Sequence, residues 1–446
     1  MHSPGGLRER LRGLVSVVVD ASNLHLLTSR ALRVNKPDAS ILIAFGKASV
    51  PMARAAVELL GDRIEGGVVV IPKWRKAEKI DGLEVIRASH PVPDEDSLRA
   101  GEAVVEWAKS SAGKGLIVLV SGGGSALVEK PQPGLTIDDI VEATRQLLYS
   151  GANIHEINTV RKHLSLVKGG WLAKHASPGP VYGFYASDVP GDRLESIASG
   201  PTVPDPTTYG DALRVVDKYG LRDKMPERVI EVLEEGLRGL RPETPKPGDA
   251  VFSNVSNRLV ASNLDVLRRL ASFLEGQGYN TIILTSRLDG ESREAGRVLA
   301  SIALEAYERG IPVETPAALI LGGETTVTVR NPGGKGGRNQ ELALAWLASV
   351  DYWLGGDGVM GLLAMDTDGI DGNSDAAGAI VVSGDSNELR LRRLDPGEYL
   401  NSNNSYEALK AIDGLIVTGP LDSNLNSVVV VLVEKGSGDG SRGFRD

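Results

Sequence analysis

The sequence predicts an α/β fold in which helices cover mostly parallel β-sheets. Short apolar runs rich in β-branched residues alternate along the chain with longer segments whose apolar residues recur every three or four positions. The first pattern is typical of buried strands and the second of amphipathic helices. Their alternation is the order found in parallel sheets covered by helices. At roughly 150 residues per domain, a chain of 446 residues is expected to form more than one domain.

The expected strands are short and apolar, and several end at a polar or glycine-rich loop. In chain order they are residues 41–46, 68–72, 116–121, 181–188, 281–286, 318–323, 362–366, 415–419 and 428–433. Clear helical periodicity lies between them, at residues 51–60, 97–111 and 291–310. In an open parallel sheet the loops that follow the strands share one edge, where ligands bind.

A proline-rich segment separates the two halves of the chain. Residues 241–249, RPETPKPGD, contain three prolines in nine positions, a composition that favours an extended linker over a helix. We therefore predict one domain over residues 1–245 and a second over residues 246–446. The sequence leaves open whether the last two strands return to the first domain.

Composition argues against several classes of function. The net charge of −9 disfavours sequence-independent binding to nucleic acid, which depends on a basic surface. The chain has no cysteine, which excludes disulfides, thiolate zinc sites and cysteine nucleophiles. No apolar run approaches the roughly 20 residues of a membrane helix, and the apolar run near the N-terminus is too short for a signal peptide. We expect a cytoplasmic protein without nucleic-acid or membrane partners.

Two loops have the residues of an anion site. SGGGS, at residues 121–125, follows an expected strand, and its glycines lack a Cβ, so that backbone N–H groups can approach a phosphate. The alternative for three consecutive glycines is an ordinary tight turn. In GKAS, Lys47 follows another strand and can hold a phosphate or carboxylate as a point charge. The alternative for Lys47 is an exposed surface lysine.

A third loop, GGKGGRNQE, places Arg338 at the start of an expected helix, followed by Asn339, Gln340 and Glu341. Arginine can donate two parallel hydrogen bonds to phosphate or carboxylate oxygens. The alternative is that these four polar residues form an exposed first helical turn.

Carboxylates follow two further strands. SDVPGD contains Asp188 and Asp192, and DTDGIDG contains Asp366, Asp368 and Asp371. Carboxylates beside phosphates hold Mg²⁺ or orient an attacking hydroxyl, although aspartate and glycine are also common in turns. Glycine loops, two basic residues and several carboxylates together fit phosphoryl transfer, in which positioning and charge stabilisation supply most of the catalysis.

Two other patterns are weaker. A G-x-G-x-x-G pattern at Gly356, Gly358 and Gly361 precedes a strand, whereas a dinucleotide-binding fingerprint must follow one, so we interpret it as a turn. The six histidines show no metal-ligand spacing. His90, in HPVPD, is interpreted as a packed loop histidine with a functional role as the alternative.

Taken together, the motifs of this chain resemble those of the glycerate 2-kinases of the MOFRL family. In order they are FGKAS, HPVPD, SGGGSAL, EINTVRKHLSLVKGGWLA, ASDVPGD, IASGPTVPDPTT, GGETTVTV, GKGGRNQELAL and DTDGIDG. The resemblance implies a Rossmann-like N-terminal domain and a smaller C-terminal MOFRL-type α/β domain. It also implies a kinase that uses ATP, with Mg²⁺ or another divalent metal, to phosphorylate D-glycerate at the 2-hydroxyl in an interdomain cleft.

The resemblance further implies roles for individual residues. The expected catalytic residues are Lys47, Arg338 and Asp188. The expected nucleotide-binding residues are Ser121, Gly122, Gly123, Gly124, Ser125 and Asp192. The expected substrate-binding residues are Asn339, Glu341, Glu324 and Asp368, and a metal is expected at Asp188 and Asp366.

Two segments depart from the family pattern. TGPLDSN, at residues 418–424, stands where the family tends to have TGPTGTN, and NNSYEAL, at residues 403–409, where it tends to have NDSY followed by aromatic residues. Such changes would alter substrate or nucleotide preference if the segments line the site. The alternative functions are an oxidoreductase of the hydroxypyruvate reductase type and a non-catalytic nucleotide- or sugar-acid-binding protein. The choice between 2- and 3-phosphorylation stays open, and a homodimer is expected.

Overall fold

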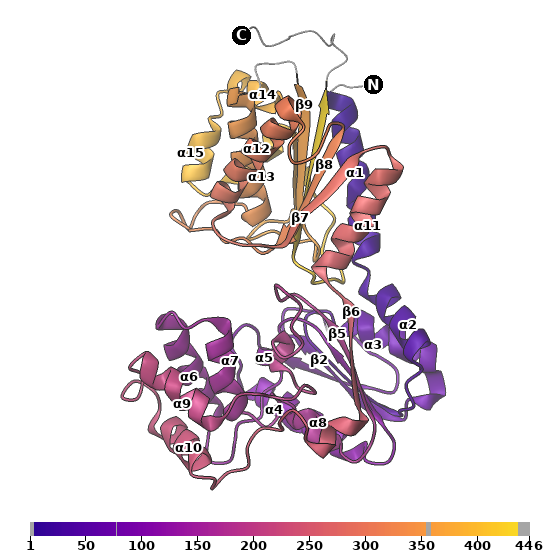
Figure 1. Ribbon diagram of the computed structural model, residues 1–446, viewed down its shortest axis with the longest axis vertical. Coiled ribbons are helices and arrows are strands. Elements are labelled where there is room, and N and C mark those ends of the chain that lie inside the picture. Colours follow the sequence, from indigo (N-terminus) through magenta and orange to yellow (C-terminus); the bar gives the residue numbers. More distant parts are fainter. Residues whose placement is uncertain (1–3, 77, 354–357, 436–446) are drawn as a thin grey trace. The chain divides into compact units, whose positions relative to one another are not determined.

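The chain forms two compact units. The computed structural model describes residues 4–76, 78–353 and 358–435 (Figure 1). The first unit comprises Leu24–Ala261 and is called the N-terminal unit. The second comprises Ser262–Asp446 together with Met1–Asn23 and is called the C-terminal unit. Among the described residues, no helix has the length and apolar character needed to cross a membrane.

The sheet of the N-terminal unit is parallel throughout, with strand order β3-β2-β1-β4-β5-β6. This is the order of Rossmann-type sheets, as expected from the family resemblance. The strands are β1 (Ile41–Phe45), β2 (Gly66–Pro72), β3 (Glu84–Ala88), β4 (Leu116–Val120), β5 (Val181–Ala186) and β6 (Val255–Ala261). Strands β1, β2 and β4 are buried along their whole length, which explains their continuous apolar sequences.

Helices cover this sheet and also form a second, purely helical core beside it. They are α2 (Leu24–Asn35), α3 (Ser49–Leu60), α4 (Glu95–Ser110), α5 (Gly124–Leu127), α6 (Ile137–Tyr149), α7 (Ile154–His163), α8 (Trp171–Ala176), α9 (Tyr209–Lys218) and α10 (Glu227–Leu237). Helices α6, α7, α9 and α10 enclose an apolar cluster of their own and lie together in Figure 1.

The C-terminal unit has a second sheet, with strand order β11-β10-β9-β12-β8-β7. Its strands are β7 (Asn280–Leu288), β8 (Ala317–Gly323), β9 (Gly358–Asp366), β10 (Gly378–Val382), β11 (Leu415–Ile416) and β12 (Ser427–Lys435). Its helices are α1 (Pro4–Ala21), α11 (Asn263–Gly276), α12 (Ser292–Arg309), α13 (Arg338–Trp353), α14 (Asp385–Leu391), α15 (Pro396–Asn401) and α16 (Ser405–Ala411).

The second sheet corrects the expectation of mostly parallel sheets. Strands β7 and β8 are parallel, but β8 with β12, β12 with β9, β9 with β10 and β10 with β11 are antiparallel. The reason is that the last strand, β12, inserts between β8 and β9 and runs against both. Periodicity identifies a strand but contains no information about the direction of its neighbours.

The domain boundary also differs from the prediction. Strand β6 lies beyond the proline-rich segment, yet it pairs with β5, so the N-terminal unit extends to Ala261 instead of residue 245. The last two strands do not return to that unit, since β11 and β12 belong to the second sheet. At the other end of the chain, helix α1 packs on the second sheet, where an added Cβ on Gly361 of β9 would be 2.6 Å from Leu11 Cδ1.

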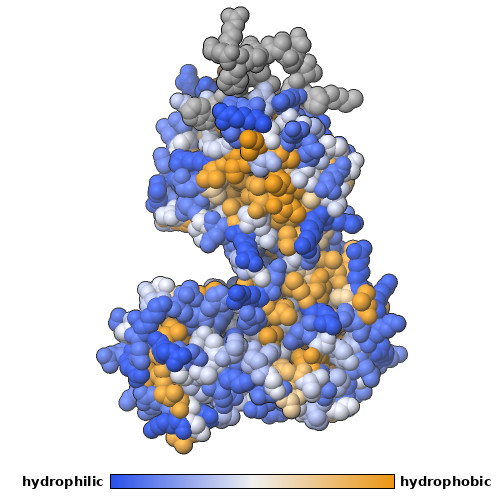
Figure 2. All heavy atoms as spheres, viewed as in Figure 1, coloured by the Kyte–Doolittle hydropathy of each residue, from blue (hydrophilic) through white to orange (hydrophobic). Residues whose placement is uncertain are grey.

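The edge strand β7 leaves apolar side chains partly accessible. Its residues 281–286 are all half-buried, and Val298 on the neighbouring helix α12 is 59% exposed. Figure 2 shows apolar side chains gathered over the part of the C-terminal unit where Figure 1 draws β7 and α12. The rest of the visible face of this unit is largely hydrophilic.

Candidate active-site residues

Lys47 lies where the strand order of the first sheet reverses. The chain adds β2 and β3 on one side of β1 and then continues with β4 on the other side. Ligands of open parallel sheets bind at this switch point, outside the carboxyl ends of the strands. GKAS follows β1 and SGGGS follows β4, so both loops lie there.

Hydrogen bonds join these two loops. The Lys47 N–H donates to the Gly122 carbonyl at 2.9 Å, and the Ala48 N–H donates to Ser121 Oγ at 3.0 Å. Ser121 is buried, so its hydroxyl is used to hold the Lys47 loop. The structure thus brings Lys47 and the glycine loop together, and it gives the Ser121 side chain an internal partner.

The glycine loop leaves backbone donors available. Within the described residues, the N–H groups of Gly122, Gly123, Gly124 and Ser125 donate to no other group. Helix α5, which begins at Gly124, has only four residues, so the loop N–H groups themselves are the donors offered to an anion. Gly123 has φ +83°, and an added Cβ there would be 3.3 Å from Lys47 Cγ. A backbone that approaches this closely fits a phosphate-binding loop.

His90 contacts the same loop. An added Cβ on Gly123 would be 3.0 Å from His90 Cδ2. Burial, with a smaller effect from the charge of Lys47, lowers the pKa of His90 to about 4. The imidazole is therefore neutral near pH 7 and can act there as a hydrogen-bond donor or acceptor beside the glycine loop.

A chain of polar groups holds Ser125. Its hydroxyl lies 2.8 Å from Ser199 Oγ, which donates to Asn158 Oδ1 at 3.0 Å. Arg161 Nη2 donates to the Ser125 carbonyl at 2.9 Å. Sequence reasoning assigned no role to Ser199, Asn158 or Arg161. Asn158 and Arg161 are three residues apart, a spacing that places them on one face of a helix. The sequence shows this spacing, but it does not show which loop that face of the helix contacts.

The turn that presents Ser199 has an uncommon backbone. Ala198 and Ser199 have φ values of +49° and +59°, a region that residues with a Cβ rarely adopt. Ala198 also packs closely on the glycine loop, since an added Cβ on Gly124 would be 2.8 Å from its own. Strained residues of this kind persist where the surrounding structure determines them, which is common at functional sites.

Asp188 and Asp192 follow β5, the strand beside β4. Both are half-buried, and Asp192 has φ +57°. The turn between them is held by Ser187, whose hydroxyl donates to the Val189 carbonyl at 3.2 Å. The loop of Asp188 and Asp192 therefore lies at the same edge of the sheet as the Lys47 and glycine loops.

Arg338, in the C-terminal unit, is surrounded by acceptors. Its Nη1 donates to Glu324 at 2.5 Å, its Nη2 to Asp366, and its Nε to Ser427 Oγ at 3.1 Å. Burial opposes ionisation, but the two carboxylates outweigh it and raise the pKa of Arg338. The three charged groups together have a net charge of −1.

Two expected substrate-binding residues lie in the interior. Glu341 is 2% exposed, pairs with Arg293 at 2.9 Å and accepts from Asn403 at 3.3 Å. Burial raises the pKa of Glu341 despite Arg293. Asn339 is 1% exposed and donates from Nδ2 to Asp371 at 3.2 Å. Both side chains bind protein groups, which makes a structural role the simpler interpretation for each.

The other two expected substrate-binding residues are more accessible. The Glu324 side chain is 50% exposed while it pairs with Arg338. Asp368 is half-buried and accepts from the Ile370 N–H at 2.9 Å. The loop of Asp368 is hydrogen-bonded to the divergent segment TGPLDSN, in which the Leu421 N–H donates to the Asp368 carbonyl at 2.7 Å. Within the C-terminal unit, the structure therefore brings Glu324 and Asp366 to Arg338, and TGPLDSN to the loop of Asp368.

The second divergent segment, NNSYEAL, holds the loop that precedes Arg338. Asn404 accepts from the Lys335 N–H at 3.1 Å, and the Lys335 ammonium lies 3.6 Å from the centroid of the Tyr406 ring. Lys335 also pairs with Asp375 at 2.9 Å. Residue changes in NNSYEAL therefore act on the position of this loop.

The described residues contain no cluster of three or more side chains arranged to hold a metal ion. Asp188 and Asp366, the expected metal ligands, belong to different units. Asp366 is buried and accepts from Arg338 and, at 3.3 Å, from Ser427. A metal bound through nucleotide phosphates needs only one or two protein carboxylates, and either aspartate fits that requirement.

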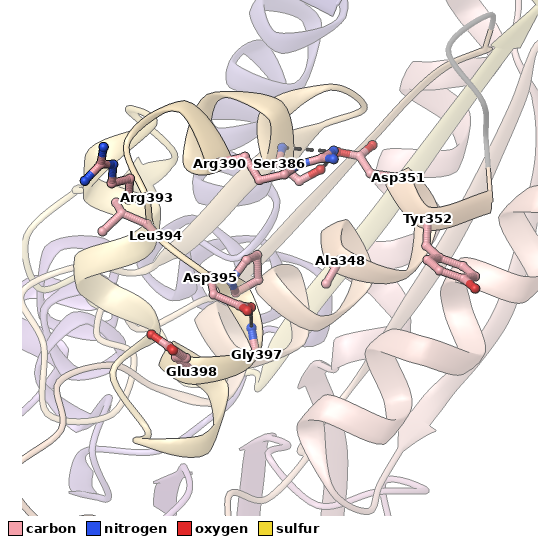
Figure 3. Close-up of a pocket in the computed structure, with 11 residues that line it drawn as sticks. Ala348, Asp351, Tyr352, Ser386, Arg390, Arg393, Leu394, Asp395, Gly397 and Glu398 are labelled. Atoms are coloured by element: carbon pink, nitrogen blue, oxygen red, sulfur yellow. Dashed lines mark hydrogen bonds between the residues drawn. The ribbon is translucent and has the colours of Figure 1, made fainter.

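A pocket of about 630 Å³ lies elsewhere in the C-terminal unit, among α13, α14 and α15 (Figure 3). None of the expected site residues lines it. Its Asp351 points to Ser386, whose N–H donates to Asp351 Oδ2 at 3.1 Å, while the Gly384 N–H donates to Oδ1 at 3.0 Å. This carboxylate caps helix α14.

The G-x-G-x-x-G pattern is not a dinucleotide fingerprint. Gly358 and Gly361 lie in strand β9, and Gly356 lies outside the described residues. The interpretation as a turn was therefore wrong for Gly358 and Gly361. Gly361 is needed where β9 meets α1, since an added Cβ would be 3.1 Å from Leu7 Cδ2.

Comparison with known proteins agrees with the two units. Residues 12–234 match the family described as "Domain of unknown function (DUF4147)", and residues 317–427 match the MOFRL family. The chain is 45% identical over 393 residues to the glycerate 2-kinase of Pyrococcus horikoshii, covering 88% of this chain and 87% of that protein. The chain belongs to the glycerate 2-kinases of the MOFRL family.

Two further comparisons cover nearly the whole length of both chains. The D-glycerate 2-kinase of Thermotoga maritima is 42% identical over 430 residues, covering 95% of this chain and 99% of that protein. A crystal structure of glycerate kinase from Thermotoga maritima matches with a TM-score of 0.88 and 41% sequence identity, covering 96% of this chain and 100% of that chain. The similarity thus covers both units of the chain.

Proposed function

We propose that this protein transfers the γ-phosphoryl group of ATP to the 2-hydroxyl of D-glycerate. Membership of the glycerate 2-kinases supports this activity. The observation that carries the proposal is the pairing of Lys47 with a glycine loop whose N–H groups are available, at the switch point of a Rossmann-type sheet. That arrangement is suited to a nucleotide phosphate.

In this proposal the N-terminal unit binds the nucleotide. The N–H groups of Gly122, Gly123, Gly124 and Ser125 donate to phosphate oxygens, and the Lys47 ammonium adds a positive charge beside them. Asp192 contributes from the adjacent loop. Ser121 acts indirectly, by holding the Lys47 loop.

Arg338 and Asp188 act on the transferred group and on the hydroxyl. The bond from the glycerate oxygen to phosphorus forms as the bond from phosphorus to the ADP oxygen breaks, and Asp188 accepts the hydroxyl proton. Arg338 stabilises charge on the phosphoryl oxygens or binds the glycerate carboxylate. In either role the ligand competes with Glu324 and Asp366 for the guanidinium charge, and it accepts from a remaining Nη–H or replaces one of these two carboxylates.

A divalent cation would neutralise phosphate charge and would be bound mainly by the phosphates. Asp366 is a proposed protein ligand, and Asp188 is a second one in the alternative in which it binds the cation instead of accepting the hydroxyl proton. Glu324 and Asp368 are proposed to contact glycerate. Asn339 and Glu341, first expected to bind substrate, are assigned to the support of helix α13 because both are buried against protein groups. We further propose a cytoplasmic homodimer, for which light scattering of the purified protein is the test.

Phosphorus NMR of the products formed from ATP, Mg²⁺ and D-glycerate tests the proposal. A 2-phosphoglycerate resonance together with ADP is expected. A 3-phosphoglycerate resonance would retain the kinase and refute the site of attack, and intact ATP would refute the activity. Oxidation of NADH or NADPH in the presence of hydroxypyruvate would instead support the reductase.

The Arg338→Ala variant tests the assignment of Arg338 in the same assay. Loss of one charge-stabilising donor is expected to lower kcat by about 100- to 1,000-fold. Arg338→Lys keeps the positive charge but lacks the planar set of N–H donors of a guanidinium, so we expect its kcat to lie between those of the native protein and Arg338→Ala. A near-normal kcat in Arg338→Ala would remove Arg338 from the mechanism.

A further inference from the structure

The first turn of helix α13 is capped by a side chain from a distant loop. Asp371 Oδ1 accepts from the Asn339 N–H at 3.1 Å, and Oδ2 accepts from the Gln340 N–H at 2.9 Å. These two N–H groups belong to the first turn, which begins at Arg338 and has no intrahelical acceptors. Gly337, which precedes the helix, has no side chain to accept them. Asp371 therefore supplies a helix cap that the local sequence lacks.

Side chains reinforce this cap. Gln340 Nε2 donates to Asp371 Oδ2 at 3.0 Å and to Ser374 Oγ at 2.8 Å. The Ser374 hydroxyl in turn donates to the Asp371 carbonyl at 2.8 Å. Asp371 is 1% exposed, so its carboxylate gives up hydration for these partners. The cost of that burial raises the pKa of Asp371 to about 6 although the hydrogen bonds oppose it.

The two loops approach so closely that glycine is required on both sides. A Cβ on Gly337 would overlap the carboxyl group of Asp371. A Cβ on Gly372 would be 2.6 Å from Gly337 Cα. The Asn373 N–H donates to the Gly336 carbonyl at 3.1 Å, and the Gly336 N–H donates back to Asn373 Oδ1 at 2.9 Å. The loop before Arg338 and the loop of Asp371 thus form one interlocked structure.

The Arg338 guanidinium forms its hydrogen bonds with residues other than Asp371. These partners are Glu324, Asp366 and Ser427. The backbone of Arg338 nevertheless belongs to the turn whose next two N–H groups Asp371 fixes. Any displacement of that turn moves the start of the Arg338 side chain relative to its three partners.

We propose that Asp371 is a positioning residue for phosphoryl transfer, holding the first turn of α13 and through it the guanidinium of Arg338. The proposal rests on the role given to Arg338 above. It predicts that Asp371 affects turnover without binding either substrate. A shift of about 1 Å in a catalytic group can lower a rate by roughly 100-fold, so an effect on kcat is expected even where the fold is retained.

The test begins with Asp371→Asn, which preserves the side-chain shape but replaces one acceptor oxygen with an NH₂ group facing an N–H donor. We expect kcat to fall by about 10- to 100-fold and KM for ATP to change by less than about threefold. Asp385→Asn is the matched control. Asp385 is also a buried carboxylate of the C-terminal unit, accepting from the Val382 N–H at 2.8 Å and pairing with Arg8 at 2.6 Å. The Asp385→Asn variant should lower the stability of the protein without the loss of kcat by about 10- to 100-fold expected for Asp371→Asn.

The double variant Arg338→Ala with Asp371→Asn distinguishes positioning from a general structural effect. If Asp371 acts through Arg338, the double variant should retain the residual kcat of Arg338→Ala, measured with radiolabelled ATP. A further large loss in the double variant would overturn the proposal, as would a normal kcat in Asp371→Asn.

Failure of the proposed function gives a different result, namely intact ATP with the unmutated protein. A normal kcat in Arg338→Ala alone would instead remove the role of Arg338 on which the proposal rests. If Asp371→Asn does not fold, Gln340→Ala replaces it, because this change removes the side-chain bonds to Asp371 and leaves both backbone bonds. A smaller loss of kcat that also disappears in the Arg338→Ala background is expected for Gln340→Ala. A loss that persists there would overturn the proposal.

Discussion

Arg338 has one positive charge between two carboxylates, and this balance limits what it can bind. Three of its five N–H groups, one on each nitrogen, have protein acceptors, on Glu324, Asp366 and Ser427. An anion must therefore compete with carboxylates that are already in place. A cation that binds Asp366 or Glu324 would weaken that competition and make Arg338 available. Metal and anion binding are expected to support each other at this cluster.

Gly123 allows a residue-scale prediction for the nucleotide loop. Gly123→Ala adds a Cβ 3.0 Å from the His90 ring and 3.3 Å from Lys47 Cγ, so Lys47 must shift. We expect KM for ATP to rise about tenfold, which corresponds to roughly 1.4 kcal/mol of binding free energy. The measurement is steady-state kinetics with ATP varied.

Gly113→Ala is the matched control. Gly113 has φ +80°, close to the +83° of Gly123, but an added Cβ meets nothing within 4 Å. Both variants should lose about 1–2 kcal/mol of stability from the left-handed backbone. Only Gly123→Ala should raise KM, and an equal KM in the two variants would argue against contact between this loop and the nucleotide.

At the scale of elements, helix α4 is a case in which sequence and structure agree. Asp94, in the HPVPD motif, accepts from the Asp96 and Ser97 N–H groups at 3.1 and 3.2 Å, and Ser97 Oγ accepts from the Asp94 N–H. Asp94→Ala is expected to destabilise the N-terminal unit by about 1 kcal/mol or more, whereas Asp94→Asn keeps a good cap and should lose less, namely the contribution of the charge. Urea denaturation at pH 7 provides the comparison.

The pH dependence of Asp94 has a definite sign. Burial raises its pKa, but hydrogen bonds from Lys73, Ser89 and the Ser97 backbone outweigh that effect and lower it from 3.8 to about 2. The stability from this depressed pKa is present above pH 3.8 and is lost as the pH falls towards 2. Unfolding measured between pH 5 and pH 2 should show a weaker dependence in Asp94→Asn, and an unchanged profile would contradict the assignment.

Element types were predicted well where burial is complete. The segments that become β1, β4, β8 and β12 are continuous apolar runs in the interior of a sheet, and each was predicted as a strand. Strands β3 and β6 were not predicted, because both are edge strands with exposed polar residues, such as Arg87 and Arg258. Strand β10 was also missed, although it is fully buried. Strand direction was wrong in the second sheet because it is set by tertiary pairing.

For the candidate site too, the sequence predicted local features better than tertiary contacts. Lys47 and the glycine loop could be brought together from the sequence, since each follows a strand and carboxyl ends of parallel strands share an edge. Asp371 was recognised only as one acid in a cluster, because its partners are backbone N–H groups more than thirty residues earlier in the chain. Glu341 was expected at the substrate from the family resemblance, and its burial beside Arg293 was not visible in the sequence.

At the scale of the whole molecule, the proposed residues divide between the two units. Lys47, the glycine loop, Asp188 and Asp192 belong to the N-terminal unit, and the Arg338 cluster belongs to the C-terminal unit. Nucleotide binding should therefore survive changes to the Arg338 cluster that abolish turnover.

Thermal unfolding with ATP tests this separation. A ligand whose free concentration is 100 times its Kd stabilises the folded protein by about 2.7 kcal/mol. We expect ATP to protect the native protein and Arg338→Ala to a similar extent, and to protect Lys47→Ala much less. Lys79→Ala, at a lysine whose side chain is 90% exposed, is the control for loss of a charge. Equal protection of Lys47→Ala and the native protein would argue against the proposed nucleotide site.

The packing of α1 on β9 separates the translation of this helix from its burial. Leu7, Leu11, Leu14 and Val18 of α1 are buried in the finished C-terminal unit, yet their partner strand is translated about 350 residues later. At a translation rate of about 5–20 residues per second, the apolar face of this helix stays without its partner strand for tens of seconds, while the N-terminal unit is synthesised. The apolar face of α1 is thus translated long before the strand that buries it, and it stays exposed on the nascent chain until β9 has been made.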